Sequence, residues 1–153
     1  MNQKQPLESM RVVRVELVKD WGHPYANLEV ENPDDLVAVL RQFLAKADRE
    51  VFLTVNLSGT NGINSINIVS MGCLTRTIVQ PREVFKAAIL CNAHKIVIAH
   101  SHVFGTPIPS EEDIKITKNL VQCGNILDIK IVDHIIIAGQ DYLSFAEKRI
   151  GGL

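Results

Sequence analysis

The run HKIVIAH, residues 94–100, is the feature of this sequence that most constrains its fold. Its four central positions, 96–99, are all apolar instead of alternating with polar ones. Uninterrupted hydrophobicity over a strand-length segment is typical of a strand covered on both faces. Segments with a helical hydrophobic period precede and follow it. We therefore expect an α/β domain in which helices pack on a central sheet.

Three segments are predicted to be helices, and each has a recognisable start. They cover residues 32–48, 81–92 and 110–125. In the first, Asn32 is a candidate N-cap and Pro33 stands at the first helical position. Pro81 begins the second. Ser110 is the candidate N-cap of the third, and Gly124 is expected to close it as a C-cap.

The other apolar segments are predicted strands. They cover residues 10–20, 50–59, 61–72, 94–100, 128–139 and 141–145. The second and third of these meet at a glycine turn and should form an antiparallel pair. The strand over 10–20 is expected at a sheet edge, and a loop follows over 21–29. No repeat, low-complexity tract or linker interrupts the chain, so we expect one α/β domain over 1–153. Its mixed central sheet carries the helices, and residues 1–31 contribute an N-terminal strand and loop.

The charge balance argues against a nucleic-acid-binding protein. The 153 residues include 16 Lys and Arg against 17 Asp and Glu, for a net charge of −1. Proteins that bind the nucleic-acid backbone usually show a basic excess or a basic face. A local basic patch stays open, because a near-neutral total can hide asymmetry.

Targeting signals and cysteine usage predict a cytoplasmic protein. We find no signal-peptide pattern and no apolar stretch of the ~18–20 residues that a membrane-spanning helix needs. The cysteines are Cys73, Cys91 and Cys123, an odd number with no C-x-x-C pair. They are expected to be reduced thiols that fill space in the core.

The segment HSHVFGTPIPSEED, residues 100–113, is the candidate site. Residues i and i+2 of a strand point to the same side, so His100 and His102 can direct both imidazoles into one space. Asp113, at the start of the next helix, could return as a third ligand of a catalytic zinc. The same Ser110-x-x-Asp113 spacing is also a capping-box signal. Spacing alone leaves both interpretations open.

Other metal motifs do not fit the sequence. It contains no H-E-x-x-H, and the zinc deaminase signature fails for want of a C-x-x-C. An H-x-H that opens a (β/α)8 barrel would require a chain of ~250 residues. The metallo-β-lactamase motif H-x-H-x-D-H also does not fit, because Phe104 and Gly105 stand at its Asp and final His positions.

One family pattern does fit. The segment matches H-x-H-x7-S-x2-D, which resembles the JAMM (MPN+, JAB) metalloprotease motif. The flanking stretches PREVFKAAILCNA and DHIIIAG are similar to the RadC branch of that family. The resemblance covers about residues 49–149, with the helix at 33–46 included. It implies a JAB/MPN fold, a cytidine-deaminase-like three-layer arrangement.

The resemblance also implies roles for individual residues. His100, His102 and Asp113 would hold a zinc ion (Zn2+), and Ser110 would position the bound water or stabilise the oxyanion. Glu50 matches the family's upstream glutamate, a general acid/base. The implied protein is a zinc-dependent metallohydrolase that cleaves a peptide or isopeptide bond in a peptide or protein substrate. The alternatives are a non-catalytic binding or scaffold module, and a nucleic-acid role associated with DNA repair.

The sequence departs from the RadC pattern after the second histidine. RadC-like proteins usually have HNHPSG, whereas this chain has HSHVFG. Val103 and Phe104 would narrow access to the site or provide an apolar contact for substrate. The chain also has no room for the N-terminal helical region of full-length RadC proteins, so we expect the catalytic-type domain almost alone. A homodimer is left open.

The remaining histidines are not predicted to bind metal. His134 lies within a strand, next to Asp133, and is expected to support a ligand or to pack in the core. His94 and His23 fall in predicted loops and should be solvated.

Overall fold

A computed structural model describes residues 28–44, 47–72 and 79–153. The predicted strand over 10–20, most of the predicted loop over 21–29, His23 and Cys73 lie outside these ranges. The elements, in chain order, are α1 (Pro33–Leu44), β1 (Val51–Leu57), β2 (Ile63–Met71), α2 (Pro81–Leu90), β3 (Lys95–Ser101), α3 (Glu111–Leu127), β4 (Lys130–Ala138), β5 (Asp141–Ser144) and α4 (Phe145–Lys148).

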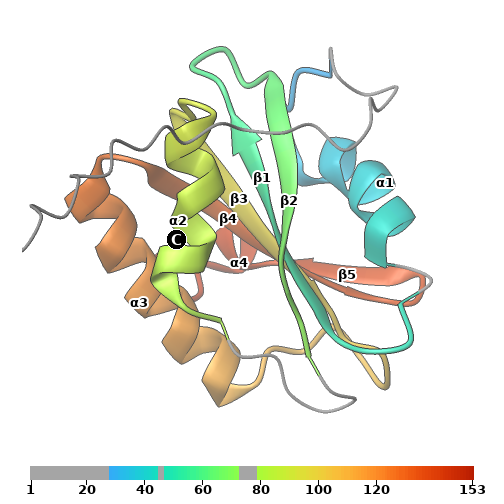
Figure 1. Cartoon of the computed structure of the whole chain (residues 1–153). Coiled ribbons are helices and arrows are strands. Elements are labelled where there is room, and N and C mark those ends of the chain that lie inside the picture. Colours follow the sequence, from blue (N-terminus) through green and yellow to red (C-terminus); the bar gives the residue numbers. More distant parts are fainter. Residues whose placement is uncertain (1–27, 45–46, 73–78) are drawn as a thin grey trace, which may run out of the picture.

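The strands form a single mixed sheet in the order β2-β1-β3-β4-β5 (Figure 1). β1 runs antiparallel to both of its neighbours, and β5 runs antiparallel to β4. Among the strands in the described part of the chain, only β3 and β4 are parallel, and α3 provides the crossover between them. The predicted α/β class and mixed sheet are confirmed.

Helices cover both faces of the sheet, so the fold has three layers. Figure 1 shows α1 on one side of the sheet and α2 and α3 on the other. Leu36, Leu40 and Leu44 of α1 pack against Leu53 and other buried side chains of the central strands. The second core lies under α2 and α3. It contains Phe52, Val84, Phe85, Ala88, Ile96, Ile98, Leu120 and Ile131. The apolar run at 94–100 is buried from Ile96 onwards, as expected for a strand between two helical layers.

The first helix begins where its cap predicts but ends earlier. Asn32 Oδ1 accepts a hydrogen bond from the Asp35 N–H at 3.2 Å, and Asp35 Oδ2 accepts one from the Asn32 N–H at 3.1 Å. This reciprocal cap fixes the start. The prediction that the helix continues to residue 48 is wrong, because Ala47 and Asp48 are not helical.

The expected C-cap at Gly124 is also wrong. α3 continues to Leu127 and ends at Asp128, which adopts a left-handed conformation with φ 56°. Gly124 is needed for close packing instead. A Cβ atom there would lie 2.6 Å from the Ile129 carbonyl oxygen and 3.3 Å from the Phe85 ring.

Smaller differences concern the chain end and the thiols. The predicted strand over 141–145 stops at Ser144, whose side chain caps the short α4. Cys91 and Cys123 lie half-buried at the margin of the second core instead of inside it. Within the described part of the chain, no helix combines the length and hydropathy needed to cross a membrane.

Candidate metal centre

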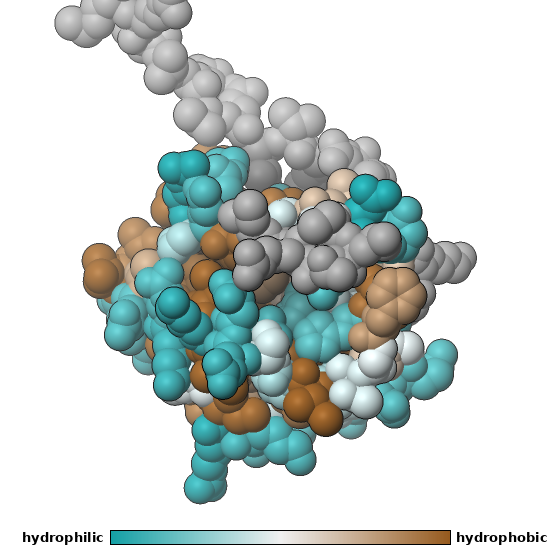
Figure 2. Space-filling model, turned by 90° about the horizontal axis from the view of Figure 1, so that it is seen from below, coloured by the Kyte–Doolittle hydropathy of each residue, from teal (hydrophilic) through white to brown (hydrophobic). Residues whose placement is uncertain are grey.

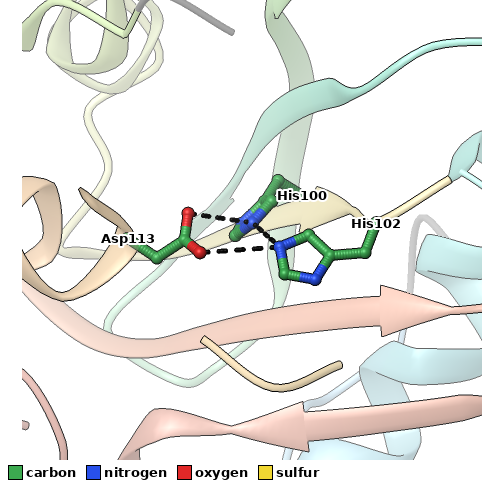
Figure 3. A group of neighbouring side chains, drawn as sticks. All are labelled: His100, His102 and Asp113. Carbon is green, nitrogen blue, oxygen red and sulfur yellow. Dashed lines mark hydrogen bonds and ion pairs between the residues drawn. The ribbon is translucent and has the colours of Figure 1, made fainter. Parts of the chain in front are cut away.

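His100 and His102 lie at the carboxyl end of β3 and point to the same side (Figure 3). The His102 N–H donates to the Ile137 carbonyl of β4 at 2.8 Å, so strand pairing continues through residue 102. The alternation of side chains therefore still applies there. His100 is buried, whereas His102 is half-buried. The two imidazole Nε2 atoms approach to 3.1 Å.

Asp113 reaches the histidines from the first turn of α3. Its N–H donates to Ser110 Oγ at 3.1 Å, and its Oδ2 accepts from the Ser110 N–H at 2.7 Å. Ser110 Oγ also donates to Oδ2, at 2.6 Å. The two interpretations of this spacing therefore coexist, because one carboxylate both caps the helix and approaches His100 and His102.

The separations between the three side chains suit a small tetrahedral metal ion. Asp113 Oδ1 lies 3.2 Å from His100 Nε2, and Oδ2 lies 3.5 Å from His102 Nε2. Zinc–ligand distances of about 2.0–2.1 Å imply ligand–ligand distances of about 3.3 Å in a tetrahedral site. The Nε2–Nε2 distance of 3.1 Å and the Oδ1–His100 distance of 3.2 Å lie close to that value, whereas the 3.5 Å distance to His102 is measured from the other carboxylate oxygen. These residues could thus hold a metal and leave a fourth position for water.

The loop after β3 fixes the orientation of the His102 ring. His102 Nδ1 lies 2.9 Å from the Thr106 carbonyl oxygen. A carbonyl can only accept, so Nδ1 carries a proton. In the neutral ring, Nε2 then presents its lone pair to His100 and Asp113, which is the state that binds a metal.

Electrostatics keep the Asp113 carboxylate ionised. Burial raises the pKa of Asp113, but hydrogen bonds with His100, His102 and Ser110 outweigh it and hold the pKa well below its usual range. The hydrogen bond with Asp113 is the largest cause that raises the pKa of His102 above its ordinary value. The ionised Asp113 carboxylate therefore stabilises positive charge on the neighbouring imidazoles.

His134 contacts His100 and does not join the three converging side chains. The pairing of β4 with β3 skips Val132, since Ile96 faces Ile131 but Val97 faces Asp133. This bulge turns His134 to the face of the sheet that carries His100. Its Nε2 lies 2.8 Å from His100 Nδ1.

His134 is fully buried, and its Nδ1 lies 2.6 Å from Thr117 Oγ1. Burial, followed by the neighbouring His100, lowers its pKa well below the ordinary value. The contacts of Thr117 and of the Thr106 carbonyl carry no sequence signal, because both depend on the tertiary arrangement. His94, by contrast, is exposed as expected.

Glu50 lies at the same edge of the sheet, immediately before β1. In the antiparallel register Phe52 faces His100. Two residues earlier on the β1 side and two residues later on the β3 side, the same register brings Glu50 opposite His102. The Val51 N–H donates to Ser101 Oγ at 3.1 Å, which supports that alignment. The negative charge of Glu50 contributes to the raised pKa of His102. Glu50 is half-buried, and its carbonyl accepts from the Gly72 N–H.

Exposed apolar side chains lie in the loop that links the histidines to Asp113. Phe104 is 75% exposed and Ile108 is 68% exposed, and both lie in the loop between His102 and Ser110. Figure 2 views the molecule from below, the side on which Figure 1 places the start of α3. It shows apolar residues (brown) set among hydrophilic ones (teal). Val103 is half-buried.

Comparison with known proteins places the chain in a family. A family model described as the RadC-like JAB domain matches residues 30–150. A UPF0758 protein of Caldanaerobacter subterraneus subsp. tengcongensis is 43% identical over 122 residues, 80% of this chain and 52% of its own length. A UPF0758 protein of Moorella thermoacetica is 40% identical over 121 residues, which are 79% of this chain and 53% of the relative's own length.

A UPF0758 protein of Desulforamulus reducens is 32% identical over 98% of this chain and 69% of its own. The chain spans about half the length of the first two relatives. The family model covers most of the chain, including the strands and helices that carry the three converging side chains. The chain belongs to the RadC-like JAB domain family.

Proposed function

We propose that this domain is a zinc-dependent metallohydrolase that cleaves peptide or isopeptide bonds. The observation that carries the proposal is the convergence of His100 Nε2, His102 Nε2 and an Asp113 oxygen, all within 4.8 Å of one another. Two imidazoles and one carboxylate, with a fourth position open, are the ligand pattern of catalytic zinc. Magnesium and calcium favour oxygen ligands throughout.

The chemistry that zinc provides suits amide hydrolysis. When bound, zinc lowers the pKa of its water to about 7 and polarises a carbonyl. The reaction also needs a group that takes a proton from water and returns it to the leaving amine. Glu50 is our candidate, because the strand register brings it opposite His102. Membership of a JAB domain family is consistent with this assignment.

Ser110 contributes first by orienting a ligand. Its hydroxyl proton is directed at Asp113 Oδ2, and its oxygen accepts from the Asp113 N–H. We propose that this pair of bonds holds the carboxylate toward His100 and His102. To stabilise an oxyanion, the hydroxyl would have to turn from Asp113 toward the substrate. That second role stays a prediction.

The substrate is proposed to be a peptide or protein, bound without nucleic acid. The net charge of −1 argues against binding to a nucleic-acid backbone. A scaffold module would not need the aligned ligands, and this chain retains all three. The cysteine usage fits a reducing compartment such as the cytoplasm.

A pair of variants tests the proposal. Protein purified without chelator should contain one zinc per chain by mass spectrometry, and Glu50→Gln should retain the zinc. Glu50→Gln should also lower the turnover of peptide substrates by roughly 10²–10⁴-fold, the usual contribution of a general acid/base. Asp48→Asn, an exposed carboxylate two residues away, is the matched control and should be unaffected. A wild type that takes up no zinc on titration would refute the metal site. Undiminished turnover in Glu50→Gln would refute the role of Glu50.

A further inference from the structure

A closed ring of contacts joins two candidate metal ligands, His100 and Asp113, through two buried residues. His100 Nδ1 lies 2.8 Å from His134 Nε2, and His134 Nδ1 lies 2.6 Å from Thr117 Oγ1. Thr117 Oγ1 in turn lies 2.6 Å from the Asp113 carbonyl oxygen. The Asp113 carboxylate then returns to His100 Nε2 at 3.2 Å. Two of the three candidate ligands are thus joined through two residues that touch no metal.

The chemistry of Thr117 sets the direction of the hydrogen bonds that link Thr117, His134 and His100 Nδ1. A hydroxyl has one proton, and a carbonyl oxygen has none to give. At 2.6 Å, the Thr117 proton must therefore point to the Asp113 carbonyl. Thr117 can then only accept from His134, so His134 Nδ1 carries the proton of its neutral ring.

The position of the proton on His134 determines the position of the proton on the candidate ligand His100. With its proton on Nδ1, His134 accepts at Nε2, so His100 must donate from its own Nδ1. In neutral His100, Nε2 is then left with a free lone pair directed at Asp113 and His102. That tautomer is the one a metal requires.

We propose that Thr117 and His134 are positioning residues that commit His100 to its metal-binding tautomer and fix its distance from Asp113. This inference rests on the proposed zinc site. Both residues are 0% exposed, so water cannot readily replace a lost partner. Ring packing holds His134 in place, with the Phe145 ring centroid 4.5 Å away on one element and Phe52 at 5.9 Å on another.

Two substitutions at Thr117 separate hydrogen bonding from packing. Thr117→Val keeps the shape but removes the hydroxyl, whereas Thr117→Ser keeps the hydroxyl but removes a methyl group. Zinc affinity is measured by competition with a chromophoric chelator, and the site geometry by the visible spectrum of the cobalt-substituted protein. We expect Thr117→Val to weaken zinc binding about 10–100-fold and to alter the cobalt spectrum. Thr117→Ser should stay within a few-fold of the wild type.

Two results would overturn the inference. One is zinc affinity in Thr117→Val equal to that of the wild type. The other is a greater loss in Thr117→Ser than in Thr117→Val, which would indicate packing alone. Thermal unfolding of both metal-free variants checks that each is folded.

A spectrum of the metal-free protein separates this inference from the proposed function. Nitrogen-15 NMR of the imidazoles should show His134 protonated at Nδ1 in the wild type and in Thr117→Ser. A proton on His134 Nε2 in the wild type would overturn the ring as inferred, whatever the metal content. If the wild type takes up no zinc although the tautomer is as expected, the proposed function fails and the hydrogen-bond ring stands.

Discussion

The two histidines of the candidate metal centre are held in different ways. His100 is buried, and a side chain from another strand, His134, fixes its far nitrogen. His102 is half-buried, and a backbone carbonyl of the adjacent loop, that of Thr106, fixes its far nitrogen. The inner histidine is therefore part of the core, and the outer one is part of a loop that carries exposed Phe104. We infer that both histidines contribute to metal affinity, that only the inner one also contributes strongly to stability, and that the outer side meets the substrate.

The largest difference should appear when each histidine is removed. His100→Ala and His102→Ala should each weaken zinc binding by more than about 100-fold, beyond the loss expected from a supporting residue. Only His100→Ala should also destabilise the metal-free protein, by about 2–4 kcal/mol, because it leaves a cavity and a buried His134 without its partner.

Urea unfolding of the metal-free variants measures that contrast. The free energy of unfolding of His102→Ala should lie within about 1 kcal/mol of the wild-type value. The same is expected of His94→Ala, which serves as a control because His94 is exposed. Equal destabilisation by His100→Ala and His102→Ala would contradict the distinction between a core ligand and a loop ligand.

The outer histidine should give the protein two opposite pH trends. The hydrogen bond with Asp113 raises the pKa of His102. In the metal-free protein this contact therefore stabilises the folded state, and its full contribution is present at pH values below about 6.5, the pKa of histidine in the unfolded chain. The contribution is lost as pH rises through the raised pKa. Zinc binding runs the other way, because zinc needs the neutral ring and its affinity should fall as pH decreases.

Two titrations check these signs. The free energy of unfolding of the metal-free wild type, relative to His102→Ala, should be greater at pH 6 than at pH 9. Zinc affinity of the wild type should be greater at the higher pH. A stability difference that grows with pH would mean that the Asp113–His102 contact does not form in solution.

The smallest effect on zinc affinity is expected from a substitution in the loop between His102 and Ser110. Phe104→Ser should leave zinc affinity unchanged, because the Phe104 side chain is 75% exposed. If this loop meets the substrate, the variant should lower kcat/KM for peptides with apolar side chains by about 10-fold, through KM. Ile126→Ser is the matched control, since Ile126 is 84% exposed at the far end of α3. Comparable losses of kcat/KM in Phe104→Ser and Ile126→Ser would contradict a specific role of this loop in substrate binding.

The inner and outer sides also differ in how far the sequence could predict them. The shared direction of His100 and His102 follows from strand alternation, and the capping box at Ser110 and Asp113 follows from their spacing, so local rules predict both. The approach of Asp113 to the histidines depends on the path of the loop, which spacing alone left open and which only the family resemblance implied. The ring behind His100 depends on a bulge at Val132 and on parallel pairing between β3 and β4, which no local pattern indicates. The sequence therefore predicted that His134 would support a ligand or pack in the core, but it did not predict which ligand His134 contacts or that Thr117 takes part.

The errors at helix ends have a similar cause. Gly124 has the residue type of a C-cap, but its lack of a side chain serves the close approach of Ile129 and Phe85. Asp128 ends the helix instead, since Asp is among the few residues that tolerate the left-handed conformation. The contact of Gly124 with Phe85 from another helix is a tertiary feature that the residue pattern does not show.

X-ray absorption spectroscopy of the zinc-loaded protein tests the central claim most directly. The account predicts two imidazoles and two further oxygen or nitrogen ligands at about 2.0–2.1 Å, with one imidazole lost in His102→Ala. A sulfur shell at about 2.3 Å, or an unchanged imidazole count in His102→Ala, would show that zinc binds elsewhere and contradict the account.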